Sequence, residues 1–172
     1  PVEGSAPKAN LLDQSKPSIY PPLDRDFIPA VLANRAFQSA AASEGVPLVL
    51  GLERENGKLS RFESLVFPDG HSLAGANLLQ AERLLKFLLW QRGGYRVYAG
   101  GPRSIGDYLR KCYSPNGARR FDAHFMGDLV YEHPFEVVPC APEEVPAESE
   151  SGTALGRHLD GCRIGFDLGA SD

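Results

Sequence analysis

The sequence predicts an α/β or α+β fold, and three features lead to this prediction. Alternating apolar residues around an Asn-Gly pair indicate a hairpin over 47–67. Apolar residues at helical spacing fill 77–92, and a strand–helix–strand pattern follows as far as residue 139. The expected order is therefore helix, hairpin, helix, strand, helix, strand. A chain of 172 residues with 42% hydrophobic and 23% charged residues can bury one core.

The first elements are an arm and a helix. Residues 1–23 are rich in Pro, Ser, Lys and Gly without periodicity, which is typical of an extended arm. A helix is expected from about 28 to 43, with Asp26 as its cap and Pro29 in its first turn. Gly45 is well placed to end this helix.

The hairpin is the clearest local signal. Its strands, 47–54 and 59–67, lie on either side of Asn56-Gly57. Both residues of an Asn-Gly pair accept positive φ, so the pair favours a two-residue hairpin turn.

The helix over 77–92 is expected to end at Gly93-Gly94. Phe87 and Trp90 widen its apolar side, which predicts that the helix lies at the centre of the core. These rings, with Tyr95 and Tyr98, are also the residue types of a sugar-stacking platform, and core packing is the alternative.

The remaining elements are shorter. A strand at 95–99 is followed by a helix from Ser104, its expected cap, to about Tyr113. An irregular stretch is expected after the turn at 114–117, and a last strand at 135–139.

Composition excludes several classes of function. A net charge of -4 argues against a nucleic-acid or anionic-membrane partner, since such partners need clustered Lys and Arg. No stretch reaches the roughly 18 apolar residues of a membrane helix, and no signal pattern is present. The three cysteines, Cys112, Cys140 and Cys162, are too widely spaced for a zinc motif. A reducing, cytoplasmic compartment is therefore expected.

A change of composition divides the chain. Proline and glutamate dominate from Ala141 onward, without large apolar side chains, as is typical of a linker. The predicted units are an N-terminal accessory domain over 24–140, an acidic linker over 141–156, and a further segment over 157–172.

The strongest functional motif lies in that further segment. A short apolar strand, Cys162 to Phe166, leads into an acid and then a glycine turn that carries a hydroxyl. An Asp after a buried strand can orient a metal or a water, and a glycine turn exposes backbone N–H groups to a phosphate. The residues concerned are Asp167, Gly169, Ala170 and Ser171.

This motif resembles the first phosphate motif of the actin-like ATPase and sugar kinase superfamily. The segment 161–172 resembles the opening of a ROK-family protein (repressor, open reading frame, kinase). The resemblance implies a place near the metal or catalytic water for Asp167 and near the nucleotide phosphates for 169–171. It also implies that the parent protein uses ATP and Mg to phosphorylate a sugar, or senses a sugar. The hairpin and later alternation resemble half of an actin-like fold, βββαβαβ.

The family's other motifs are absent from these 172 residues: the second phosphate motif, the sugar-binding His and Glu, the Asp base and the zinc cysteines. This chain alone is therefore expected to have no catalytic residues and no kinase activity. Its expected partner is the remainder of the kinase domain or a second copy of the chain.

A second candidate site is the turn of Gly100, Gly101, Arg103 and Ser104, between a strand and a helix. A helix N-terminus offers free N–H groups to a phosphate or carboxylate, and Arg103 adds a charge. The alternative is that these glycines serve backbone geometry alone. The turn leaves open a different function, a self-standing module that binds a sugar or anion, or a dimerisation module without catalysis.

The four histidines do not converge by spacing. His124 and His133 lie in the predicted irregular stretch with Asp128 and Glu132. An acid–base or metal site there and ordinary loop residues both remain open.

Overall fold

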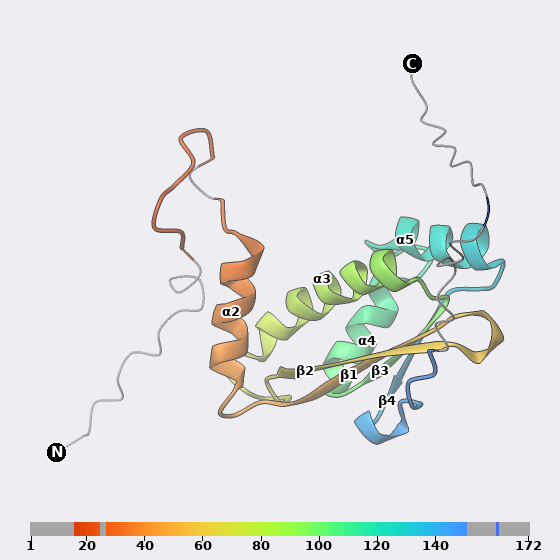
Figure 1. Cartoon of the computed structure of the whole chain (residues 1–172). Coiled ribbons are helices and arrows are strands. Elements are labelled where there is room, and N and C mark those ends of the chain that lie inside the picture. Colours follow the sequence, from red (N-terminus) through yellow and green to blue (C-terminus); the bar gives the residue numbers. More distant parts are fainter. Residues whose placement is uncertain (1–15, 25–26, 151–160, 162–172) are drawn as a thin grey trace.

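The computed structural model describes residues 16–24, 27–150 and 161, and the predicted α/β class is confirmed. Its centre is a mixed four-stranded sheet with the strand order β2-β1-β3-β4, with helices gathered on one side (Figure 1). Two strands precede the long helix α3, one fewer than in the βββαβαβ order. The strands are β1 (Val46–Glu53), β2 (Leu59–Val66), β3 (Arg96–Gly100) and β4 (Glu136–Cys140). The helices are α2 (Ala30–Ala41), α3 (Ala74–Arg92), α4 (Arg103–Cys112) and α5 (Arg120–His124). None of the helices in these ranges is long and apolar enough to cross a membrane.

The predicted hairpin is confirmed, but its turn holds one more residue than expected. Asn56 and Gly57 both have positive φ, 60° and 68°, as an Asn-Gly pair favours. A two-residue turn would pair Glu53 with Ser60, whereas Glu53 pairs with Leu59. The extra residue sets Phe62 opposite Leu50, so that Phe62 shares the helix-covered face of the sheet.

Helix α2 begins at Ala30 without a side-chain cap, two residues later than predicted, and the expected cap Asp26 lies outside the described residues. Helix α3 begins at Ala74, three residues earlier than predicted, and ends before Gly93 as predicted, with φ of 76° at Gly93. The prediction that α3 lies at the centre of the core is confirmed, since Ala81, Leu85 and Leu89 are buried, but Phe87 and Trp90 do not widen its buried side because they are 61% and 49% exposed. The sheet covers only one stripe of α3, and these rings lie outside it.

The stretch predicted to be irregular is helical. Helix α5 continues into a π-helix, η2 (Phe125–Tyr131), which ends at Glu132 with φ of 54°. A π-helix does not follow the 3.6-residue period by which helices are predicted, and Gly127 weakens the signal further. Helix α4 begins one residue before Ser104, so Ser104 is not its cap.

The core lies between one face of the sheet and the helices. Alternate residues of β1 and β3 point to this face because side chains alternate along a strand. The largest fully buried side chains are Leu48, Leu50, Leu52, Val66, Phe67, Leu85, Leu89, Val97, Ile105 and Leu109.

The opposite face of the sheet is crossed by residues 141–150, named here the strap. The sequence predicts a linker there, but these residues pack on the domain. Val145 is buried at 3% exposure, and its backbone oxygen accepts a hydrogen bond from Arg61 at 2.9 Å. Ser149 and Leu59 then exchange two backbone hydrogen bonds of 3.0 and 2.9 Å. Proline and glutamate composition alone does not reveal that a single valine fits the sheet.

Glu150 closes the strap against the hairpin and α3. Its carboxylate accepts hydrogen bonds from the Ser60 hydroxyl and from Arg54, and Arg92 lies 3.6 Å away. Ser60 first, and then Arg54, lower the pKa of Glu150. Because its folded pKa is depressed, this contact stabilises the fold above the unfolded carboxyl pKa and is lost as the pH falls.

Gly100→Ala is expected to loosen the strap and lower the free energy of unfolding by about 1–3 kcal/mol. An added Cβ would lie 2.5 Å from Val145 Cγ2, 2.9 Å from Pro142 Cα and 3.1 Å from the Ala141 oxygen. Urea denaturation measures the change. Gly75→Ala on α3 is the matched control, since its added Cβ meets nothing within 4 Å and stability should not fall. Equal stabilities of the two variants would contradict the role of Gly100.

Candidate functional site

The terminal motif, formed by Asp167, Gly169, Ala170 and Ser171, lies outside the described residues. Its predicted role in phosphate binding therefore stays a prediction. The described domain carries the second predicted site and, elsewhere, a larger cavity.

Two residues of the predicted turn, Gly101 and Arg103, line a cavity of about 370 Å³ together with Asp107 and Cys140, whereas Gly100 and Ser104 do not line it. The helix N-terminus behind it already has an acidic partner from the chain itself. Asp69 accepts a hydrogen bond from the Ser104 hydroxyl, and its other oxygen lies 3.5 Å from the Ser104 nitrogen. Arg103 is 3.5 Å from the Asp107 carboxylate. An external anion would have to compete with both carboxylates.

Two further observations bear on this turn. Gly100 is required by the close approach of the strap, which gives this glycine a packing role. Burial first, and then Glu144, raise the pKa of the Cys140 thiol. The thiol therefore stays protonated at neutral pH and offers this cavity no thiolate nucleophile.

A larger cavity, of about 680 Å³, lies where the end of α4, α5, η2 and the segment before β4 meet. It is named here the α5 cavity. Aromatic and proline side chains form much of its wall, and the Tyr113 and Phe135 rings stack with centroids 5.4 Å apart. The lining residues are Tyr113, Pro115, Arg120, Phe121, Ala123, His124, Asp128, Pro134 and Phe135.

The charged and imidazole side chains of the α5 cavity, Arg120, His124 and Asp128, lie on the continuous helical run of α5 and η2. His124 Nδ1 is 2.6 Å from Asp128 Oδ2, which leaves Nε2 without a hydrogen-bond partner among the described residues. None of the ion pairs within the described ranges involves Arg120. Tyr113 is 4% exposed, its hydroxyl has no partner among the described groups, and burial raises its pKa. The cavity thus combines aromatic faces with a cation, an oriented imidazole and a neutral phenol.

The backbone around the α5 cavity is unusual. Its wall includes part of a seven-residue π-helix, a rare element that often occurs at functional sites. Glu132, which ends that helix, is one of two described non-glycine residues with positive φ. Gly127 allows the chain before β4 to pass close by, since an added Cβ would lie 2.8 Å from the His133 oxygen.

A buried polar cluster holds α5 against α3 and α4. Arg119 Nε donates to Glu82 at 2.7 Å, and the Tyr108 hydroxyl donates to the same carboxylate at 2.6 Å. The hydrogen bond to Glu82 raises the pKa of Tyr108, so its hydroxyl stays a donor. Nearby, Trp90 Nε1 donates to buried Asp122 at 2.7 Å. This cluster positions the wall of the α5 cavity, although its carboxylates do not line the cavity.

The structure does not bring the other predicted groups together. His133 stacks on Tyr95 with centroids 4.5 Å apart, whereas His124 pairs with Asp128. No ring contact in the described ranges joins Tyr95 or Tyr98 to the rings of Phe87 and Trp90. No group of three or more His, Cys, Asp or Glu that could hold a metal occurs among the described residues.

Sequence reasoning did not identify Arg120 and Phe121 as site residues, because it expected no helix there. The four-residue spacing of His124 and Asp128 was the available signal, since side chains at i and i+4 meet on a helix. Comparisons of the chain with family models, curated proteins and solved structures find no match.

Proposed function

We propose that residues 27–150 form a docking domain for the polypeptide that follows residue 150 in the same protein. The resemblance of 161–172 to a ROK-family opening supports the further proposal that this polypeptide is a sugar kinase or sugar-sensing unit that uses ATP and Mg. In this proposal the docking domain contributes no catalytic residue. It holds the unit that begins with the phosphate motif of Asp167 to Ser171.

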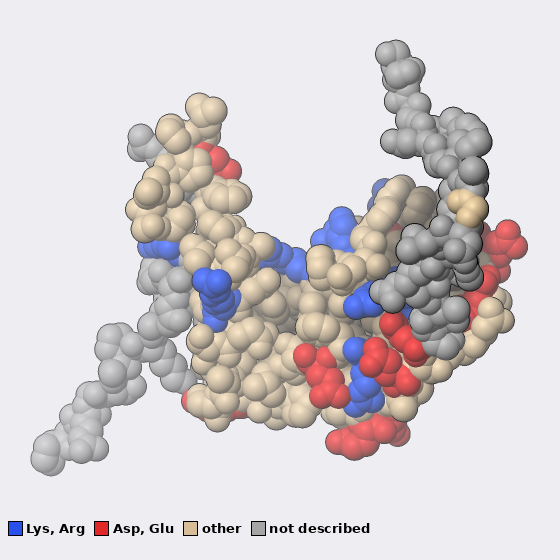
Figure 2. All heavy atoms as spheres, in the orientation of Figure 1, with Lys and Arg blue, Asp and Glu red and all other residues tan. Residues whose placement is uncertain are grey.

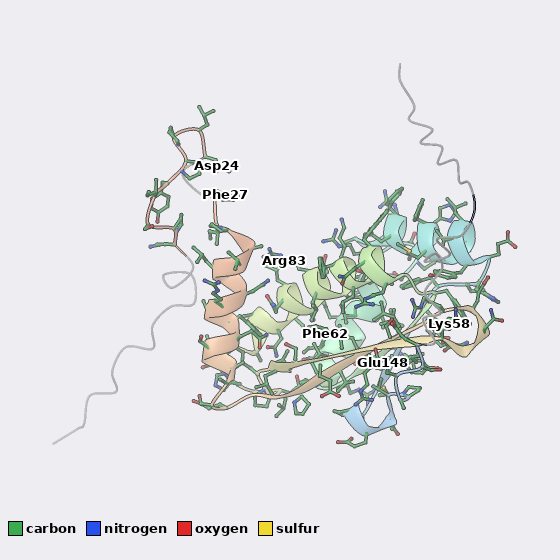
Figure 3. All side chains as sticks on the ribbon, viewed as in Figure 1. Asp24, Phe27, Lys58, Phe62, Arg83 and Glu148 are labelled. Atoms are coloured by element: carbon green, nitrogen blue, oxygen red, sulfur yellow. The ribbon has the colours of Figure 1, made fainter. Side chains whose placement is uncertain are left out.

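Exposed apolar side chains support a docking role. They lie just before and on α2, on β2 and along α3, and two of them, Phe62 and Phe87, lie beside the strap. Exposed apolar patches of this kind mark interaction surfaces. The members are Phe27, Ile28, Val31, Phe62, Leu79, Phe87 and Trp90. In Figure 3 the labelled Phe62 lies between α3 and the sheet, and Glu148 of the strap lies nearby.

The observation that carries the proposal is the position of Glu150, the last residue of the strap. Glu150 is held by Arg54 and Arg92, and Arg92 ends the helix that exposes Phe87 and Trp90. Phe62, Phe87 and Glu148 line the same small cavity of about 170 Å³. The following polypeptide therefore starts beside Phe62 and Phe87, and a segment joined through a short flexible linker has an effective concentration on the order of millimolar.

Charge favours the same surface. Figure 2 shows Asp and Glu side chains over the lower part of the molecule and at its right edge, with some Lys and Arg side chains among them. Lys and Arg lie along the upper surface beside α3 in that view. Arg83, exposed on α3, takes part in none of the ion pairs of the described residues. The exposed apolar side chains along α3 thus have basic neighbours and suit a partner surface with acidic residues, whereas Glu148 adds a carboxylate at the strap.

Hydrogen exchange on the protein with the sequence encoded after Asp172 tests the proposal. We expect amides of β2 and of α3 near Phe87 to exchange at least about tenfold more slowly than in the 172-residue chain, because docking removes local opening. Phe87→Ser is expected to abolish this difference. Leu129→Ser is the matched control, since Leu129 is equally exposed at 62% but lies on η2.

Equal exchange in the longer protein and the 172-residue chain would contradict docking. Protection that depends on protein concentration would instead identify a second copy as the partner. ATP consumption with a panel of sugars tests the kinase part separately, and Asp167→Asn should remove any such activity. Docking without any ATP consumption would support the docking proposal, contradict the kinase proposal and point to a sugar sensor.

A further inference from the structure

We propose that the α5 cavity binds a small molecule with a flat aromatic or heteroaromatic ring that carries a carboxylate or a phosphate. This site is separate from the docking surface and does not depend on the proposed docking. Its volume of about 680 Å³ lies within the range of small-molecule sites.

The ring is expected to lie against Phe121 and Phe135. Phe121 is 65% exposed and still lines the cavity, so one face of its ring is available for stacking. Phe135 is already part of a stack with Tyr113, and aromatic stacks extend readily by an offset ring. Pro115 and Pro134 add rigid apolar walls. A flat ring gains more contact here than a puckered or branched group of the same size.

The anionic group is assigned to Arg120. Two nearby arginines, on α4 and just before α5, are already engaged: Arg110 pairs with Asp107 at 2.9 Å, and Arg119 pairs with Glu82 at 2.7 Å. Arg120 has no such partner among the described carboxylates, so its guanidinium can bind a carboxylate or phosphate through two parallel hydrogen bonds.

The carboxylate of the cavity itself is engaged by a neighbouring side chain. Asp128 accepts a hydrogen bond from His124 Nδ1, which occupies one carboxylate oxygen and orients the imidazole. With the proton on Nδ1, Nε2 of His124 is an acceptor for a hydroxyl or amino group on the ligand ring. The site therefore favours a ring with an anionic substituent and a hydrogen-bond donor.

The backbone supports a ligand site at this position. The π-helix and the left-handed Glu132 are costly conformations, and they persist where the surrounding structure holds them, often beside ligands. Together they place His124, Asp128 and Phe135 around one cavity.

Protein-observed NMR titration of the 172-residue chain tests the site. The probes are 4-hydroxybenzoate and phenyl phosphate, which compare the two anionic groups. Methyl 4-hydroxybenzoate lacks the anion and cyclohexanecarboxylate lacks the flat ring. We expect at least one of the first two to give saturable shifts at Phe121, His124 and Phe135, and the last two to bind about tenfold more weakly or less.

Variants assign the contacts. Arg120→Ala is expected to weaken the binding of the anionic aromatic probe by about tenfold or more, because the probe loses its charged hydrogen-bonding partner. Phe121→Ala should weaken it as well, and both side chains are exposed enough for the fold to survive. Arg35→Ala, which removes an exposed arginine on α2, is the control that should leave affinity unchanged.

Three results would overturn the proposal. The first is that neither anionic aromatic probe gives saturable shifts at the cavity wall at about 10 mM. This concentration would reveal binding with a Kd in the millimolar range. The second is equal binding of methyl 4-hydroxybenzoate. The third is equal binding to the Arg120→Ala and Arg35→Ala variants.

Discussion

Replacement of Asn77 by alanine is expected to lower the free energy of unfolding by about 3 kcal/mol or more. Asn77 is completely buried in α3 and holds the chain just after β2. Its Oδ1 accepts from the Phe67 nitrogen at 3.0 Å, and its Nδ2 donates to the Phe67 oxygen at 2.7 Å. Alanine would leave a buried N–H and a buried C=O without these partners, and each orphaned group costs about 1–3 kcal/mol.

Urea denaturation, followed by circular dichroism, measures this loss. Asn34→Ala on α2 is the control, because Asn34 is exposed and accepts only one long hydrogen bond, from Gln80 at 3.3 Å. Its effect should stay within about 0.5 kcal/mol. A loss below about 1 kcal/mol for Asn77→Ala would show that the Phe67 backbone finds other partners.

Arg119→Ala is expected to lower the free energy of unfolding by about 2–3 kcal/mol. This is somewhat less than breaking a fully buried ion pair costs, because Arg119 keeps some contact with water. The Glu82 side chain is only 9% exposed and lies 2.7 Å from Arg119. Without Arg119, its negative charge would stay buried with only the Tyr108 hydroxyl and the Cys112 thiol nearby.

The neighbouring arginine provides the control for this prediction. Arg120→Ala removes an exposed side chain without an ion pair in the described ranges, so the unfolding midpoint should change little. The double variant Glu82→Ala with Arg119→Ala should lose less than the sum of the single variants, since each single change leaves the other group unpaired. Additive losses would mean that the pair does not hold α5 in place.

Local chemistry in the sequence was sufficient for several elements. Asn56-Gly57 predicted the hairpin turn because both residues tolerate positive φ, and Gly93 predicted the end of α3 for the same reason. The register of the hairpin was not predictable locally. It depends on which residues of β2 face the helices, and the extra turn residue keeps Phe62 opposite Leu50.

The candidate sites divide in the same way. The turn at Gly100 to Ser104 was found from its glycines, but its acidic partner Asp69 lies 35 residues away in the chain. The α5 cavity was missed because η2 lacks the usual helical period, and its walls come from segments before and after that helix.

The sequence by itself determined the α/β class, the order of the main elements and the glycine-directed turns, because these depend on residues close together in the chain. Only the tertiary structure decided the hairpin register, the exposure of Phe87 and Trp90, and the packing of Val145 across the sheet. These features depend on surfaces that meet only after folding. The proline- and glutamate-rich segment packs on the sheet because Val145 fits over Gly51 and Gly100. The composition of the segment does not predict that fit.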